Sequence, residues 1–143
     1  MRSFAVHALR LIALTFCFTV ACAMQNPEPA LAMRDKAAEV WVVELKEMQR
    51  QADPRQQEEP VRAQVVIKEV ERSAVGMKPG DVVCVAYSAS NPDYRGITRP
   101  GLLYPPLMSS GVVYRVWLTA PQRAGDCFSP GADWASINRV SGY

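Results

Sequence analysis

Short runs of β-branched and aromatic residues recur along the chain, separated by stretches rich in proline, glycine and polar residues. Such runs are typical of strands, because branched and aromatic side chains pack well on a pleated surface. Four of them cover residues 39–48, 61–71, 81–88 and 112–119, and residues 126–128 form a shorter fifth. The pattern predicts an all-β fold with five short strands.

The first run, residues 39–48, fits both the period of a helix and the period of a strand. A helix and a strand over residues 39–48 would both place Trp41 and Leu45 on one face, and only a strand adds Val43 to that face. We favour the strand, because residues 40–43 are all β-branched or aromatic.

The other segments differ in how they are expected to be buried. The polar residues 49–60 contain Pro54 and Pro60, which block a longer helix or a central strand, so we expect a solvated connection there. Residues 81–88 are apolar at both parities and predict a strand that is buried on both faces. Residues 112–119 have one apolar face.

Two local signals concern register and turns. The alternation in residues 61–71 breaks because Val70 has the opposite parity, and a β-bulge near Lys68 and Glu69 would restore it. The Lys-Pro-Gly-Asp sequence at residues 78–81 predicts a type II turn, since proline presets φ at the second position and glycine supplies the positive φ of the third.

The N-terminal segment has the parts of a secretory signal. Basic residues precede an apolar run over residues 11–24, and a polar, proline-containing stretch follows. The run is about 14 residues long, short of the roughly 20 that a membrane-spanning helix needs. We expect cleavage after Ala32, with cleavage after Ala23 or lipidation of Cys22 as alternatives. Residues 1–32 are then a signal peptide, and residues 33–143 form one exported domain that has no membrane span and is periplasmic or secreted.

Removal of the leader also removes His7, the single histidine of the chain. Without imidazole the mature chain cannot form a Ser-His-Asp triad, a Cys-His dyad or a histidine-ligated zinc site. The formal charge of +2 is far from the basic excess of a nucleic-acid-binding surface. We therefore expect neither an enzyme nor a cofactor, a metal site or a nucleic-acid partner.

Two weaker signals point to chemistry. Glu69 and Glu71 would share one face of a strand, with their Cα atoms about 7 Å apart if no bulge intervenes, but a solvated strand end explains them better. Asn91 and Asp93 could supply oxygen ligands to calcium, although Asn-Pro-Asp is also an ordinary turn sequence.

The body of the chain keeps two cysteines, Cys84 and Cys127. An even pair in an oxidising compartment predicts a disulfide, with two separate buried thiols as the alternative. Closing this loop would stabilise the fold by roughly 4 kcal/mol in the chain-entropy model.

Five short strands favour a small, partly closed β-barrel, because closure removes exposed sheet edges, and an open sandwich is the alternative. The order of the runs resembles the netrin-module or metalloproteinase-inhibitor-like OB-fold family, on the segments 39–48, 65–70, 78–85 and 110–118. The resemblance implies a five-stranded OB-like barrel with a core over about residues 39–128, and residues 129–143 are expected to be an irregular tail.

Inhibitors of that family chelate the protease zinc through an N-terminal cysteine. Neither expected mature start, Met24 or Met33, is a cysteine. We therefore carry over no site residue from the resemblance.

Residues 89–110 contain four prolines and predict an unusually long irregular connection. Aromatic and guanidinium side chains of the kind enriched at interfaces lie within it, and they give the candidate binding residues Tyr94, Arg95, Arg99 and Tyr104. Alternatively the loop folds back as a structural lid. We expect a non-enzymatic binding module for a protein, a peptide or an envelope polymer, with an OB-type protease inhibitor or a lipid-anchored envelope protein as alternatives.

Overall fold

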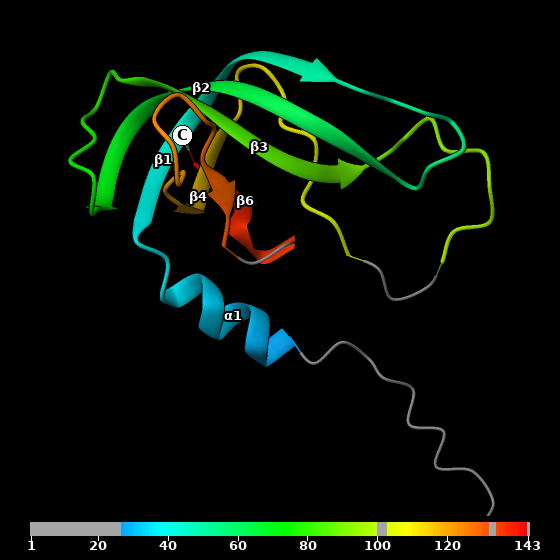
Figure 1. Ribbon diagram of the computed structural model, residues 1–143, viewed down its shortest axis with the longest axis horizontal. Coiled ribbons are helices and arrows are strands. Elements are labelled where there is room, and N and C mark those ends of the chain that lie inside the picture. Colours follow the sequence, from blue (N-terminus) through cyan, green and yellow to red (C-terminus); the bar gives the residue numbers. More distant parts are fainter. Residues whose placement is uncertain (1–26, 100–102, 132–133, 143) are drawn as a thin grey trace, which may run out of the picture.

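The computed structural model describes residues 27–99, 103–131 and 134–142 (Figure 1). Within them, the elements in chain order are α1 (Pro27–Asp35), β1 (Glu39–Arg50), β2 (Glu58–Ser73), β3 (Val82–Ser90), β4 (Val113–Thr119), β5 (Ser129–Pro130), the 3-10 helix η1 (Trp134–Ser136) and β6 (Ile137–Arg139). The prediction of an all-β fold is confirmed.

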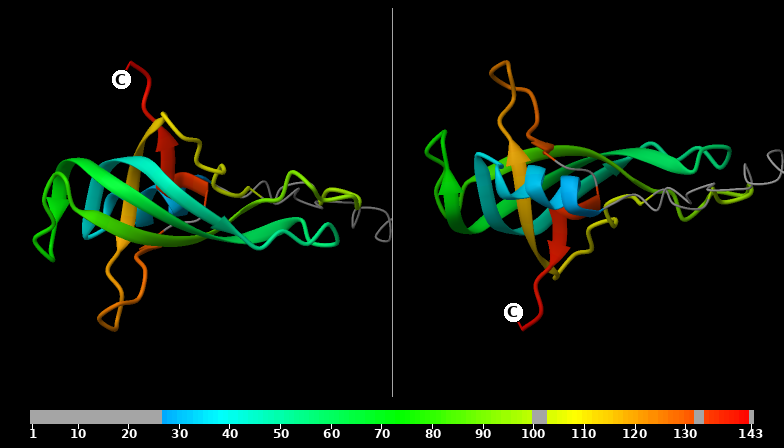
Figure 2. Two further views of the ribbon diagram at one scale, coloured as in Figure 1. Left: turned by 90° about the horizontal axis from the view of Figure 1, so that it is seen from above. Right: turned by 90° about the horizontal axis from the view of Figure 1, so that it is seen from below.

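The strands of the described chain form one antiparallel sheet in the order β3-β2-β1-β4-β5, and β6 pairs with β4. β1, β2 and β3 form a meander, and β4 returns after a long connection to lie beside β1. This order is that of a Greek key. The sheet curls (Figure 2) but is not closed into a barrel, because β3 meets the segment that leads into β5 only at an isolated parallel bridge between Val85 and Phe128. The expected barrel is thus an open, curled sheet, and β6 adds a strand to the expected five.

The bridge and the predicted disulfide connect β3 to the segment that leads into β5, and we call this junction the seam. The Ala86 N–H donates to the carbonyl of Phe128, and the Phe128 N–H donates to the carbonyl of Cys84, both at 2.8 Å. Cys84 and Cys127 form a disulfide with their Cα atoms 4.6 Å apart. The disulfide is confirmed, but the last strand begins at Ser129 and not at residue 126.

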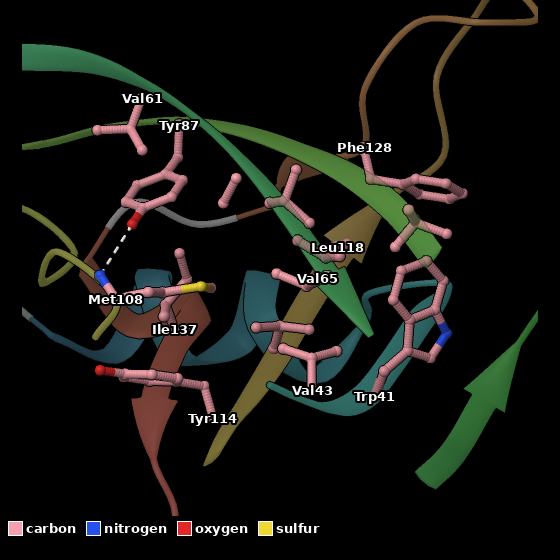
Figure 3. Close-up of a cluster of buried hydrophobic side chains, with 14 of the residues drawn as sticks. Trp41, Val43, Val61, Val65, Tyr87, Met108, Tyr114, Leu118, Phe128 and Ile137 are labelled. Carbon is pink, nitrogen blue, oxygen red and sulfur yellow. Dashed lines mark hydrogen bonds between the residues drawn. The ribbon is translucent and has the colours of Figure 1, made fainter. Parts of the chain in front are cut away.

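β1 is the central strand, and its predicted strand character is confirmed. Trp41 and Val43 are fully buried in the core, and Leu45 packs against it. The ring of Trp41 meets that of Phe128 edge-on, with centroids 4.8 Å apart (Figure 3). The core therefore spans the seam and joins the first strand to the last third of the chain.

The register of β1 and β2 confirms the bulge predicted near Lys68. Val42 pairs with Glu69 and Val43 pairs with Ile67, which leaves Lys68 as the extra residue. A second shift leaves Glu71 unpaired, between the partners of Val40 and Trp41. Such bulges bend a strand and increase its twist, which fits the curled hairpin. The type II turn is also confirmed, with Gly80 at φ 93° and a 3.1 Å hydrogen bond from the Asp81 N–H to the Lys78 carbonyl.

Two expectations about strands are corrected. Pro60 lies inside β2, opposite Ser88 of β3. Proline is tolerated at this position because the side of Pro60 that faces β1 lies at the end of the β1–β2 ladder. On that side, the Pro60 carbonyl accepts the N–H of Gln51 at 3.1 Å. β3 is buried on one face only, with Val82 exposed on the other, because the described strands form a single sheet that packs on the core with one face.

Both ends of the domain hold elements that the sequence prediction lacked. α1 extends across Ala32 and includes residues assigned to the leader; its proline at the first position and its acidic first turn favour a helix start. The expected irregular tail contains β5, η1 and β6, and Ile137 of β6 is buried. Strands of two or three residues are too short to show a period. Residues 1–26, which contain the apolar run and Cys22, lie outside the described residues.

We expect replacement of both cysteines, Cys84→Ala with Cys127→Ala, to lower the free energy of unfolding by about 4 kcal/mol, because the open chain gains loop entropy when it unfolds. Urea unfolding of the double variant and of the oxidised parent checks this. Reductant should destabilise the parent and leave the variant unchanged. Equal unfolding midpoints for the variant and the oxidised parent would contradict the expectation.

Candidate functional site

Two loops lie side by side at the end of the β1–β2 hairpin (Figures 1 and 2). One is the β1–β2 connection, residues 51–57, and the other follows β3, residues 91–99. The pairing of Glu58 with Ser90 at the end of the β2–β3 ladder brings the loops together. We call these two loops the tip.

Asn91 fastens the two loops to each other. Its side-chain amide donates to the carbonyls of Asp53 and Gln56, both at 2.8 Å, and its backbone N–H donates to the carbonyl of Gln57 at 2.9 Å. Its side-chain oxygen accepts the N–H of Asp93 at 2.9 Å. The buried Asn91 side chain is therefore a structural clamp and not a free oxygen donor for calcium.

A charged group supports the base of the tip. Glu59 is 0% exposed, and its carboxylate is bound by the Arg50 guanidinium, with Nη2 at 2.8 Å and Nε at 3.0 Å from Oε1. Arg50 also reaches Asp93 of the second loop at 3.1 Å. The hydrogen bond to Glu59 raises the pKa of Arg50. The sequence prediction assigned residue 59 to a solvated connection, and this was wrong, because Glu59 lies on the inward face of β2.

The second loop is also held through its backbone. The Arg99 N–H donates to Oε1 of Gln57 at 3.1 Å, and Nε2 of Gln57 donates back to the Arg99 carbonyl at 3.5 Å. The Arg95 N–H donates to the Pro54 carbonyl at 3.1 Å. These bonds fix the path of the loop and leave the arginine side chains exposed.

A pocket of about 240 Å³ lies between the two loops and the chain that follows them. We call it the tip pocket, and its lining side chains are Arg55, Gln56, Gln57, Glu58, Tyr94, Arg99 and Tyr104. The structure therefore brings together three of the four predicted binding residues. Arg95 is the exception, because it is exposed on the same loop and lies outside the lining.

The sequence prediction missed the four lining residues 55–58. Residues 55–57 belong to the β1–β2 connection and Glu58 begins β2, whereas the predicted binding surface was confined to residues 89–110. A usable signal was present, because three strands in a meander place the first connection and the chain that leaves the third strand at the same end of the sheet.

The second half of the long loop packs on the core. The Tyr87 hydroxyl donates to the Pro106 carbonyl at 3.3 Å and accepts the N–H of Met108 at 3.2 Å, and the Met108 side chain is buried (Figure 3). Leu103, which precedes the lining residue Tyr104, is 52% exposed. The loop thus combines an exposed tip with a segment that covers the core, as the lid alternative described.

Two other hollows have a different character. One, of about 270 Å³, lies beside α1 and is lined by Asp35, Val40, Glu71, Arg72 and Trp117. Its charged groups are engaged, since Glu71 binds Arg115 at 2.7 Å and Arg72 donates to two backbone carbonyls. The other, of about 220 Å³, lies beside the disulfide and is lined by Glu47, Gln49, Arg62, Gln64 and Cys84. Neither contains a predicted binding residue.

No protein-family model, curated protein or solved structure matches this chain. Among the described residues, no helix is long and apolar enough to cross a membrane. Over the same residues, no three histidine, cysteine, aspartate or glutamate side chains are grouped so that they could hold a metal ion. Function is therefore inferred from the geometry of the tip.

We expect Arg50→Met to lower the free energy of unfolding by about 3 kcal/mol, because it leaves the buried Glu59 carboxylate without its cation. The matched control is Arg115→Met, which breaks a similar pair with the more exposed Glu71 and should cost less than about 1 kcal/mol. Denaturant unfolding of both variants measures the difference. Equal losses would contradict the larger contribution expected of the pair with the buried Glu59.

Burial raises the pKa of Tyr87 to about 12, and the hydrogen bond from Met108 opposes the shift only in part. Since the unfolded chain ionises near pH 10, this group stabilises the fold below pH 10, and the contribution is lost as the pH rises toward 12. Absorbance titration of the folded protein should show a tyrosine ionisation near pH 12 that is absent in Tyr87→Phe. If the variant instead lost a group that titrates near pH 10, the expectation would be wrong.

Proposed function

We propose that the chain is an exported, non-enzymatic binding module and that the tip pocket is its binding site. The observation that carries the proposal is the convergence of three chain segments on one pocket whose walls are arginine, glutamine and tyrosine side chains. Such side chains are enriched where proteins recognise partners. The partner class is a protein, a peptide or an envelope polymer.

Rigidity supports a binding role for the tip. Asn91, the Arg50–Asp93 pair and the Gln57–Arg99 bonds hold both loops before any partner arrives. A site that is ordered in advance loses less conformational entropy on binding and so keeps more of its contact energy as affinity.

Export is part of the proposal. The apolar run over residues 11–24 supports a signal peptide, and a disulfide is compatible with an oxidising compartment such as the periplasm or the exterior. Cleavage after Ala23 would leave α1 whole, whereas cleavage after Ala32 would remove most of it. Lipidation of Cys22 would instead give a lipid-anchored envelope protein.

We also propose that the fold is of the OB type, like the netrin-module and metalloproteinase-inhibitor-like family. The Greek-key order of β1 to β4 and the partly open seam beside the Val85–Phe128 bridge support this assignment.

A protease inhibitor is the second candidate function. It is favoured by Ile97, which is 92% exposed on a loop whose backbone is held at Arg95 and Arg99. An inhibitor of this kind would act through the loop and not through a terminal cysteine. Absence of inhibition across metalloproteases and serine proteases would remove this candidate.

We expect ligands selected from a random peptide library or from envelope-polymer fragments to perturb the amide resonances of residues 53–58 and 91–99. Tyr104→Ala and Arg99→Ala should each weaken binding about tenfold or more, because they remove walls of the pocket. Arg95→Ala is the matched control, with the same residue type on the same loop but outside the lining, and should change the Kd by less than about threefold.

Two results of this experiment would overturn the proposal. One is that selected ligands perturb a different face of the sheet. The other is that binding survives both pocket substitutions in protein whose thermal stability is unchanged.

A further inference from the structure

The charges of the tip pocket narrow the chemistry of its ligand. Arg55, Arg99 and Glu58 are the charged lining residues, and they leave one net positive charge. Within the described part of the chain, neither guanidinium forms an ion pair or a side-chain hydrogen bond, whereas Arg50 at the base of the tip is paired twice. Two residues of the pocket lining therefore carry arginine forks that have no partner in the described part of the chain.

An arginine fork matches the planar geometry of a carboxylate, to which it can donate two parallel hydrogen bonds. Glu58 decides between anions, because its own negative charge in the lining disfavours a doubly charged phosphate more than a singly charged carboxylate. The two forks and this counter-charge fit a monoanion.

The backbone at both arginines is fixed. The Arg55 N–H donates to Oδ1 of Asp53 at 2.9 Å, and the Arg99 backbone is held on both sides by the Gln57 side chain. Fixed attachment points limit the entropy lost when the two side chains converge on one anion.

The surroundings of the pocket indicate what carries the carboxylate. The half-buried rings of Tyr94 and Tyr104 form amphipathic walls, and the exposed apolar side chains of Ile97 and Leu103 belong to the same loop. A pocket of about 240 Å³ has room for about one side chain. Exposed apolar side chains on the loop that supplies Arg99 suit an acidic residue that is flanked by apolar residues.

We propose that the tip pocket binds the carboxylate of a peptide, with Arg55 and Arg99 as its ligands and an apolar residue of the same peptide against Ile97 and Leu103. The carboxylate comes from an acidic side chain or from a free C-terminus, since both present the same planar anion. This inference rests on the proposed function and adds the chemical class of the partner.

The test uses the exported, disulfide-bonded chain and three synthetic peptides. The first is Ala-Leu-Glu-Leu-Ala with both ends blocked, the second is the same peptide with glutamine in place of glutamate, and the third is the glutamine peptide with a free C-terminal carboxylate. We expect the first or the third peptide to bind at least about tenfold more tightly than the second at pH 7, and high salt should reduce the preference. Whichever acidic peptide binds identifies the source of the carboxylate.

The arginine variants distinguish recognition by Arg55 and Arg99 from a general effect of positive charge on the tip. Arg55→Gln and Arg99→Gln should each reduce the acid-over-amide preference to less than about threefold, and Arg95→Gln, outside the lining, should keep it. Because the three arginine side chains are exposed, their replacement should leave the melting temperature unchanged.

Three outcomes would overturn the inference. Equal affinity for the acidic peptides and the neutral peptide, with shifts confined to the tip, would reject the carboxylate and leave the proposed function standing. Tighter binding of inorganic phosphate or of phosphatidylglycerol vesicles, lost in Arg55→Gln and Arg99→Gln, would assign the pocket to phosphate. If none of the peptides perturbs the tip and library-selected ligands bind elsewhere, the proposed function fails as well.

Discussion

β1 pairs with β2 along nearly its whole length but with β4 only over residues 39–44. The second half of β1 therefore has a neighbour on one side only, and the β1–β2 hairpin extends beyond β4. β3 accompanies this extension up to the Glu58–Ser90 pair, so the chain that leaves β3 emerges beside the β1–β2 connection. The unequal pairing of one central strand thus creates the tip and sets which two loops meet there.

The seam of the sheet shows how few contacts can hold a curled fold. Two backbone hydrogen bonds, one disulfide and the Trp41–Phe128 contact connect β3 and β1 to the chain near residue 128. The disulfide removes entropy from the unfolded chain, while the aromatic contact adds burial in the folded one. Because these effects act on different states, a short segment without regular pairing keeps a defined place in the core.

The features that could be predicted from the sequence are those encoded by neighbouring residues. Alternation located the strands, the parity change at Val70 located the bulge at Lys68, and the even pair of cysteines located the disulfide. Contacts between residues that are not neighbours in the sequence could not be predicted in this way. The burial of Glu59 depends on Arg50, and β6 exists because Ile137 fits against β4; neither contact leaves a period along the chain. The same holds for the pocket, whose tyrosines and Arg99 were predicted and whose residues 55–58 were not.

The tip separates two uses of charge. Glu59 is buried at the base of the tip, and a buried carboxylate is stable only when it is paired with a cation. Arg50 supplies that cation and therefore stabilises the fold. Arg55 and Arg99 lie in the two loops of the tip and are exposed to water. A guanidinium that has no partner among the described residues costs little there and remains available to an anion. Asn91 and Gln57 hold the backbone through neutral amides, and this leaves the charge of the pocket lining to its own side chains. If Arg55 and Arg99 formed ion pairs within the tip, they would no longer be available to the proposed ligand.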